Sequence, residues 1–225
     1  DMVWSWSTEG HIGVPESQRW CSTIVNNPAT LPDNRPAYDI VHLNAIQPDG
    51  DGVIVSLRHT DAVYRIRKDT GAVDWKLGGT ATAQSLTPLH DPHADQPFGG
   101  QHDVRRLPDG TLTVHDNRTI ESGSPRAVRY RIDTTARTAT LIEQVIDPDP
   151  HLSFCCGGAR KLPDGDWVIS WGGTPYVTEL TSTGQRVFRM TFPNFQSYRA
   201  NPILPGRLSR AALRAGMEAM HPRSH

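Results

Sequence analysis

Two histidines stand at matching positions in separate stretches of this chain. His102 lies seven residues before Asp109, where an Asp-Gly turn begins. His42 lies seven residues before Asp49 and nine before Asp51, and glycine follows each of these aspartates. Successive side chains of a strand alternate between its two faces, and all these separations are odd, so we expect both imidazoles on the same face. Two convergent imidazoles can serve as nucleophile, acid or base near neutral pH.

An arginine occupies a second matching position. Arg58, in SLRHT, aligns with Asp116 in VHDN and with Trp171 in SWGG. A guanidinium is planar, permanently charged and rich in N–H donors, so beside two imidazoles it would form a receptor for an oxyanion. In the third stretch the histidine position holds Gly157, whose small size leaves room.

Three repeated segments must position these side chains. They cover residues 42–77, 101–142 and 156–192, and they align on their Asp-Gly turns. Each segment reads as four short strands, the first leading into an Asp-Gly hairpin and the third alternating apolar and polar residues. Four-stranded units repeated along a sequence are typical of a β-propeller, in which the first strands line a central channel. We therefore predict an all-β protein in which residues 1–225 form one propeller domain.

The repeat accounts for three blades and one orphan strand. The stretch MVWSW, residues 2–6, resembles the outermost strand of an earlier blade. Closed propellers carry four to eight blades, so we expect this chain to be the C-terminal part of a longer propeller. His11 follows on a loop that would cross toward the next inner strand and could reach the channel. No helical period is evident before residues 208–220, where a short amphipathic C-terminal helix is expected.

The composition excludes some partners. Among 225 residues, 23 basic and 24 acidic side chains give a net charge of −1, which offers no basic face for nucleic acid. No apolar run approaches the length of a membrane span, and the opening DMVWSWSTEG has neither the basic start nor the apolar centre of a signal peptide.

The three cysteines, Cys21, Cys155 and Cys156, are too few for a disulfide framework. Cys21 could pair with one of the two neighbours, or all three could be buried thiols. The cysteines therefore leave the redox compartment open.

Several blocks in these segments together resemble the arylsulfotransferase (ASST) family, bacterial enzymes that use aryl sulfate esters as sulfuryl donors. The blocks are DIVHLNAI, IVSLRHTDAVYRI, TGAVDWKLGG, GGQHDVRRLPDGTLTVHDN and PRAVRYRID. The resemblance extends from about Trp4 to Arg199, nearly the whole chain. It implies a six-bladed propeller, of which this chain would supply the later blades.

The resemblance also implies a mechanism, ping-pong transfer through a sulfated histidine. His102, the histidine after Gln101, would be the nucleophile. His42 and Arg58 would hold the sulfuryl oxygens, and His11 is the loosest match to a further family histidine. The substrates would be an aryl sulfate donor and a phenolic acceptor, with no cofactor and no metal.

Other positions follow from the same blocks. Asn44 and Asn117 are expected to support the catalytic side chains. Where family members usually carry an aromatic residue before the Asp-Asn pair, this chain has His115. The family also implies an extracytoplasmic location, whether periplasmic, secreted or anchored to the surface.

Three alternatives stay open. His90 and His93, with Asp91 and Asp95, have the spacing of metal ligands, although loops of this composition are commonly solvent-facing turns. DTGAVDWK resembles a repeat of quinone-dependent propellers, but its tryptophan does not recur in the other segments. The strongest alternative is a non-catalytic propeller that binds an anionic ligand. Residues 147–151 and the adjacent cysteines are taken as structural.

Overall fold

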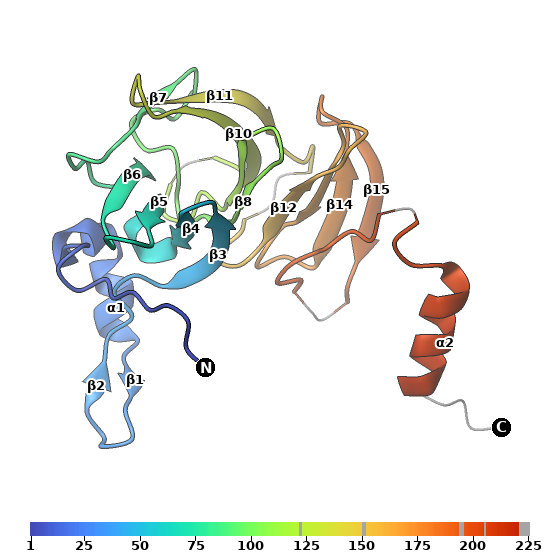
Figure 1. Cartoon of the computed structure of the whole chain (residues 1–225). Coiled ribbons are helices and arrows are strands. Elements are labelled where there is room, and N and C mark those ends of the chain that lie inside the picture. The colour runs from blue at the N-terminus through green and yellow to red at the C-terminus, as the bar shows by residue number, and fades with distance from the viewer. Residues whose placement is uncertain (122, 150–151, 194–195, 205, 221–225) are drawn as a thin grey trace.

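The computed structural model describes residues 1–225 except 122, 150–151, 194–195, 205 and 221–225. Its main body contains three sheets, and one repeated segment supplies four antiparallel strands to each of them (Figure 1). The first sheet has the order β3-β4-β5-β6, with β3 Leu43–Asp49, β4 Gly52–Leu57, β5 Ala62–Arg67 and β6 Val73–Gly78.

The other two sheets repeat this order. The second consists of β8 His102–Arg106, β9 Leu112–Asp116, β10 Arg126–Asp133 and β11 Thr138–Val145. The third consists of β12 Gly158–Lys161, β13 Trp167–Ser170, β14 Tyr176–Leu180 and β15 Arg186–Thr191. The predicted four-stranded units are therefore confirmed. The second sheet also gains β7 Thr87–Leu89, which pairs with β11 in parallel and which the repeat does not predict.

The Asp-Gly turns set the register of all three units. Gly50, Gly110 and Gly165 have φ angles of 60°, 80° and 100°, which only glycine adopts at little cost. Each turn joins the first strand of its sheet to the second. The same turn in each sheet therefore starts the pairing at an equivalent place.

Apolar side chains fill the space between neighbouring sheets. The core between the first two sheets includes Ile54 and Val63 on one side and Val114 and Val128 on the other, none more than 1% exposed. The core of the third sheet contains the large side chains of Trp167 and Trp171. Burying one such side chain contributes roughly 1.5–3 kcal/mol, so these contacts hold the sheets in fixed positions.

The expected orphan strand does not form. Residues 1–7 make no strand pairing, and the indoles of Trp4 and Trp6 instead donate hydrogen bonds to the carbonyls of Lys68 and Gly71 in the β5–β6 turn. The two rings also pack against the outer core of the first sheet. This segment pairs with no strand among the described residues, and its side chains hold it in place.

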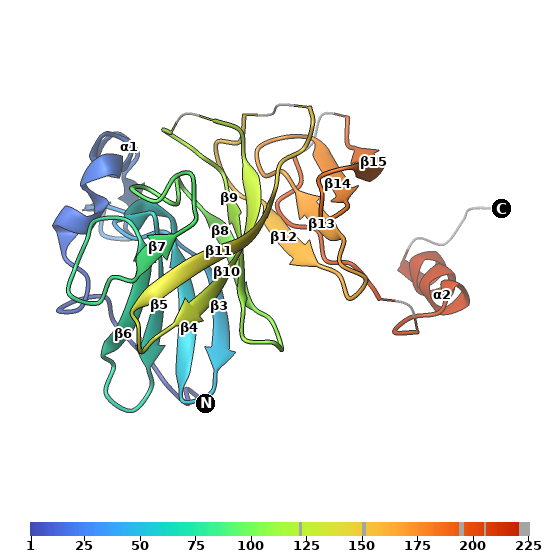
Figure 2. The same cartoon turned by 90° about the horizontal axis from the view of Figure 1, so that it is seen from above.

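The helices partly match expectation. The amphipathic C-terminal helix is confirmed as α2 Arg210–Met220, which stands away from the sheets in Figures 1 and 2. Two early helices were not expected, η1 Val14–Trp20 and α1 Cys21–Asn26, followed by the small hairpin of β1 Ala29–Thr30 and β2 Pro36–Ala37. They are short and have few buried residues, so no 3.6-residue period marks them. Among the described residues, none of the helices is long and apolar enough to cross a membrane.

Candidate active site

His102 begins β8 and is only 1% exposed. Its Nδ1 lies 3.0 Å from the carbonyl oxygen of Gly100. A carbonyl can only accept, so Nδ1 carries the proton and the lone pair lies on Nε2. That lone pair accepts a hydrogen bond of 3.2 Å from the backbone N–H of Cys156. In the residue expected to act as nucleophile, Nε2 is therefore unprotonated and is covered by the Cys156 backbone N–H.

Burial is the main reason why the pKa of His102 is lowered to about 3. Charge on neighbouring His115, Arg58 and His42 lowers the pKa further, against the opposing effect of the Gly100 hydrogen bond. The imidazole is consequently neutral at physiological pH, as a nucleophile must be.

The structure brings His42 to His102, with 6.4 Å between the ring centroids. His42 precedes β3 with a φ of 52°, in the left-handed region that non-glycine residues seldom adopt. Asp39 holds this conformation, since one carboxylate oxygen accepts from the His42 backbone N–H at 2.9 Å and the other lies 2.5 Å from Nδ1. A carboxylate on Nδ1 is the arrangement that orients an imidazole for acid–base work.

Arg58 follows β4 at the start of η2 Arg58–Thr60 and is buried beside the histidines. Its Nη2 donates to the carbonyl of Phe154 at 2.7 Å, and its Cζ lies 4.0 Å from the centroid of the Trp20 ring. Its Nε is buried and has no hydrogen-bond partner among the described residues. Burial lowers the pKa of Arg58, yet a guanidinium stays protonated in proteins, so the site holds a positive charge.

His59 joins this cluster, although the sequence motif pointed only to the arginine before it. Its Nδ1 lies 2.6 Å from the backbone carbonyl of Asp39, so its Nε2 is free to accept from Arg58 at 2.9 Å. Its ring lies 4.8 Å from that of His42 and stacks on Trp20 at 5.2 Å. Burial lowers the pKa of His59, and this neutral imidazole orients the guanidinium. The adjacent Arg-His pair in SLRHT was the available signal.

Asn44 links the first two sheets next to His102. Its Nδ2 donates to the carbonyl of Gln101 at 2.9 Å, and its Oδ1 accepts from the backbone N–H of Asp103 at 3.3 Å. These two bonds straddle His102 in the sequence. Asn44 therefore positions the start of β8 and supports His102 from the backbone side.

Asn117 is a buried hub under the same ring. Its Nδ2 lies 2.8 Å from the Gly100 carbonyl, 2.9 Å from the Cys156 carbonyl and 3.3 Å from Nδ1 of His102. Its Oδ1 faces Nε2 of His115 at 3.0 Å. The supporting role expected for Asn117 therefore has a clear geometric basis.

His115 replaces the usual aromatic residue and is packed as one. It is fully buried, with its ring edge-on to Trp171 at 5.8 Å, and burial lowers its pKa to about 4. A side chain at Gly157 would place its Cβ 2.3 Å from Cδ2 of His115. The glycine in the third segment thus makes room for His115 in particular.

The structure does not bring His11 to the cluster. Its ring stacks on Trp6 at 5.2 Å, and both lie beside Gly71 in the β5–β6 turn. This turn is at the opposite end of β5 from Arg58, and six strand residues span about 20 Å. The loop therefore stays at the outer edge of the first sheet and does not cross to the inner strands.

A cavity of about 290 Å³ opens beside the cluster. Its lining comprises Thr23, Ile24, Asn27, Asp39, His42, Arg58, His59, Phe154 and Cys155. His102 is not exposed in this cavity, since the Cys156 backbone covers its Nε2. A ligand in the cavity would reach Arg58 and His42 first.

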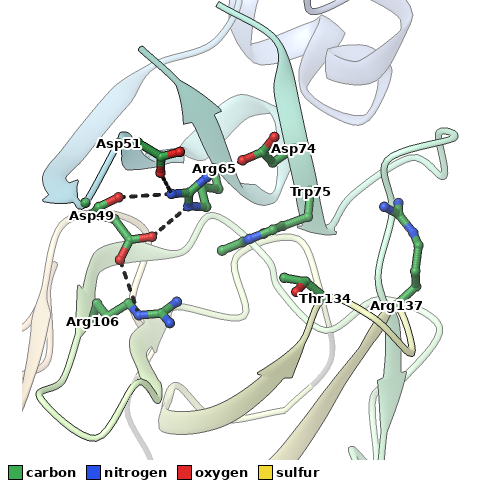
Figure 3. A pocket seen from close by; sticks show the side chains of 9 residues that line it. Asp49, Asp51, Arg65, Asp74, Trp75, Arg106, Thr134 and Arg137 are labelled. Atoms are coloured by element: carbon green, nitrogen blue, oxygen red, sulfur yellow. Dashed lines mark hydrogen bonds and ion pairs between the residues drawn. The ribbon is translucent and has the colours of Figure 1, made fainter. Parts of the chain in front are cut away.

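A larger cavity of about 590 Å³ lies elsewhere, around Arg65 (Figure 3). Arg65 pairs there with Asp49 at 2.7 Å, with Asp51 at 2.5 Å and with Asp74. Asp49 ends β3, whereas His42 precedes its start, so this cavity is a strand length from the histidines. Its three carboxylates are already paired with Arg65 or Arg106, and the smaller cavity is the better candidate site.

The cluster is better suited to an anion than to a cation. Asp39, His42 and His59 do place potential ligand atoms within 4.8 Å of one another, as a metal site requires. However, Arg58 lies 2.9 Å from Nε2 of His59, and its charge opposes a cation there.

The metal alternative in the loop of residues 90–95 is also weakened. The carboxylate of Asp91 is bound by Arg126 at 2.8 Å and by the hydroxyl of Tyr130. The same carboxylate accepts a hydrogen bond from the backbone N–H of His93 at 2.8 Å, as aspartate does in a tight turn. Asp91 therefore has the contacts of a structural residue.

The fold and the site together define a protein of blade-like sheets with a cluster of histidines and one arginine between inner strands. The family model Arylsulfotransferase (ASST) matches residues 1–193, and the chain belongs to this family. No curated protein matches the chain significantly.

Solved structures with a similar arrangement are distant. A protein of unknown function from Bacteroides caccae is 16% identical, with a TM-score of 0.43, over 70% of this chain and 48% of that one. Kuenenia stuttgartiensis hydrazine synthase is 14% identical, with a TM-score of 0.42, over 71% of this chain and 37% of that one. The β-propeller domain of Myceliophteria thermophila Cps50 (Swd1) is 10% identical, with a TM-score of 0.44, over 70% of this chain and 45% of that one. The chain thus spans less than half the length of each.

Proposed function

We propose that this protein transfers a sulfuryl group from an aryl sulfate ester to a phenolic acceptor through a sulfohistidine at His102. The observation that carries the proposal is the juxtaposition of a neutral His102, with its lone pair on Nε2, and a buried Arg58 charge. His42, oriented by Asp39, has its ring 6.4 Å from that of His102. Family membership supports the same chemistry.

The first half-reaction uses these groups in order. Nε2 of His102 attacks sulfur, the bond from sulfur to the aryl oxygen breaks, and the electron pair leaves on the phenolate. Negative charge grows on the sulfuryl and phenolate oxygens, where the N–H donors of Arg58 stabilise it. His42 supplies the proton that the leaving phenolate takes up.

The second half-reaction reverses these roles. The acceptor phenol loses its proton to His42, its oxygen attacks sulfur, and the bond between sulfur and Nε2 breaks. His102 returns to its neutral state. No nucleotide donor enters this scheme. By analogy with the family, we place the reaction outside the cytoplasm.

The sulfohistidine is tested with 4-nitrophenyl sulfate in the absence of acceptor. We expect intact-mass spectrometry to detect one added sulfuryl group, peptide mapping to locate it on His102, and one equivalent of 4-nitrophenolate to be released. His102→Ala should abolish both signals, and Arg58→Met should slow them by about 100-fold or more, the usual size for loss of one transition-state donor.

His11→Ala is the matched control, since His11 lies at the far end of β5. This substitution should leave the burst, the release of one equivalent of 4-nitrophenolate, unchanged. Binding of the sulfate ester without any covalent adduct would overturn the proposal and favour the non-catalytic anion-binding alternative. Adduct formation that persists in His102→Ala would overturn the role of His102.

A further inference from the structure

Two adjacent cysteines lie directly over the candidate active site. Cys155 and Cys156 are both free thiols, and their sulfurs are 2.6 Å apart. In an extended chain, neighbouring side chains point to opposite sides. Here the φ angles of Cys156 and Gly157 are 67° and 93°, and this turn brings both sulfurs together. Cys21 is also free but exposed, so the three cysteines are neither bridged through Cys21 nor all buried.

The backbone of this segment occupies both reactive groups of the site. The Phe154 carbonyl accepts from Nη2 of Arg58 at 2.7 Å, and the Cys156 N–H donates to Nε2 of His102 at 3.2 Å. A carbonyl and an N–H thus satisfy the same donor and lone pair that a sulfate ester would use. Residues 154–156 therefore form a latch, which must move before Nε2 can react with a sulfur atom.

Several contacts hold the latch in its closed position. Asn117 donates to the Cys156 carbonyl at 2.9 Å, and the Gly157 N–H donates to the Tyr198 carbonyl at 2.8 Å. Both contacts are made by the peptide between Cys156 and Gly157, which directly follows the peptide that caps His102. Small changes in the rigidity of this peptide therefore bear directly on access to Nε2.

We infer that Cys155 and Cys156 form a redox-modification site, in which a disulfide between them locks the latch closed over His102. An eight-membered ring through the peptide that joins them restricts its rotation and keeps the Cys156 N–H on Nε2. The inference rests on the proposed function only for its biological meaning, because reactivity of the His102 nitrogen can be measured without any sulfate transfer.

The oxidation balances with a small-molecule disulfide as the oxidant. Cys155 is half-buried and lines the 290 Å³ cavity, so its sulfur attacks the oxidant and releases the first thiol. Burial raises the pKa of Cys156 to about 12, so this thiol reacts second. It attacks the Cys155 sulfur, expels the second thiol and passes its proton to it. Two electrons pass from the cysteines to the oxidant.

The test uses glutathione disulfide as oxidant and diethyl pyrocarbonate as the imidazole reagent. Oxidation should remove two hydrogens from the peptide that carries both cysteines, as mass mapping reports. Carbethoxylation of His102, followed by peptide mapping, should then be roughly fivefold to tenfold slower than in the reduced protein, the size that a persistent hydrogen bond produces. Dithiothreitol should restore the faster rate.

Two variants make the result specific. Cys155→Ser should keep the rate of the reduced protein after oxidation, whereas Cys21→Ser, with the exposed cysteine removed, should respond like the parent. A stable mixed disulfide on Cys155 without ring closure would overturn the inference. So would a disulfide that leaves His102 carbethoxylation unchanged or faster. Neither result would contradict the proposed sulfohistidine intermediate, which the burst with 4-nitrophenyl sulfate tests separately.

Discussion

At the scale of the residue, the site depends on which nitrogen of each imidazole carries the proton. The carbonyls of Gly100 and Asp39 accept from Nδ1 of His102 and of His59. The Nε2 lone pair of His102 therefore accepts from the Cys156 N–H, and that of His59 accepts from Arg58. A residue of any type provides a backbone carbonyl. No sequence motif therefore marks these two hydrogen bonds.

The buried environment of His102 gives a pH prediction. With its pKa lowered to about 3, His102 stays neutral throughout the mildly acidic range. Its carbethoxylation rate in the reduced protein should therefore change little between pH 7 and 5. An unperturbed imidazole of pKa near 6.5, such as N-acetylhistidine, should slow by more than about tenfold over the same range. A His102 rate that falls in parallel with N-acetylhistidine would contradict this prediction.

At the scale of the element, three equivalent strand starts meet at one place. β8 begins with His102, His42 immediately precedes β3, and Gly157 immediately precedes β12. Because β3 and β8 are inner strands of neighbouring sheets, their first residues come close although they are far apart in sequence. The glycine contributes space, which His115 fills.

Gly157→Ala should therefore be strongly destabilising. The new Cβ would overlap the His115 ring in a backbone conformation that already disfavours side chains. We expect a loss of about 2–4 kcal/mol in the free energy of unfolding, measured by urea denaturation.

Gly165→Ala is the matched control for this substitution. Gly165 has a similar φ of 100° but nothing within 4 Å of the added Cβ. The free energy of unfolding should fall by only about 1–2 kcal/mol, the cost of placing a side chain in this backbone conformation. Equal losses at the two glycines would show that the His115 contact is unimportant.

At the scale of the whole molecule, buried titratable groups couple stability to pH in opposite directions. His102 and His115 have folded pKa values lowered to about 3 and 4, so the unfolded chain binds protons first and stability falls as the pH drops below about 6.5. Burial raises the pKa of Asp61 to about 6, so its contribution instead increases as the pH falls through that value.

The combined contribution of His102 and His115 outweighs that of Asp61. Between pH 7 and 5 we expect a net loss of roughly 2–3 kcal/mol in the free energy of unfolding, from about 1.4 kcal/mol per proton and pH unit. His115→Gln should reduce this loss to under about 1 kcal/mol, because one proton uptake is removed. Urea midpoints at pH 7, 6 and 5 measure both. A loss of the same size in His115→Gln would exclude His115 as a source.

The repeated unit, the order of strands within it and the closeness of His42 to His102 can all be predicted from the sequence. These follow from local turn chemistry and from a repeat that places equivalent residues at equivalent points of adjacent sheets. The blade-like sheets were therefore predictable, and so was the place of Arg58 beside the histidines. The early helices were not, because they are short and held by a few contacts such as Trp20.

How the site is closed, and which histidines belong to it, depends on contacts between segments that are far apart in the sequence. The latch reaches Arg58 across 96 residues of sequence and His102 across 54, through backbone atoms that leave no residue pattern. His11 was separated from the cluster by the docking of Trp6 on the β5–β6 turn, a long-range contact that strand periodicity does not encode. Periodicity specifies local structure, whereas contacts between distant segments depend on how the sheets and loops pack.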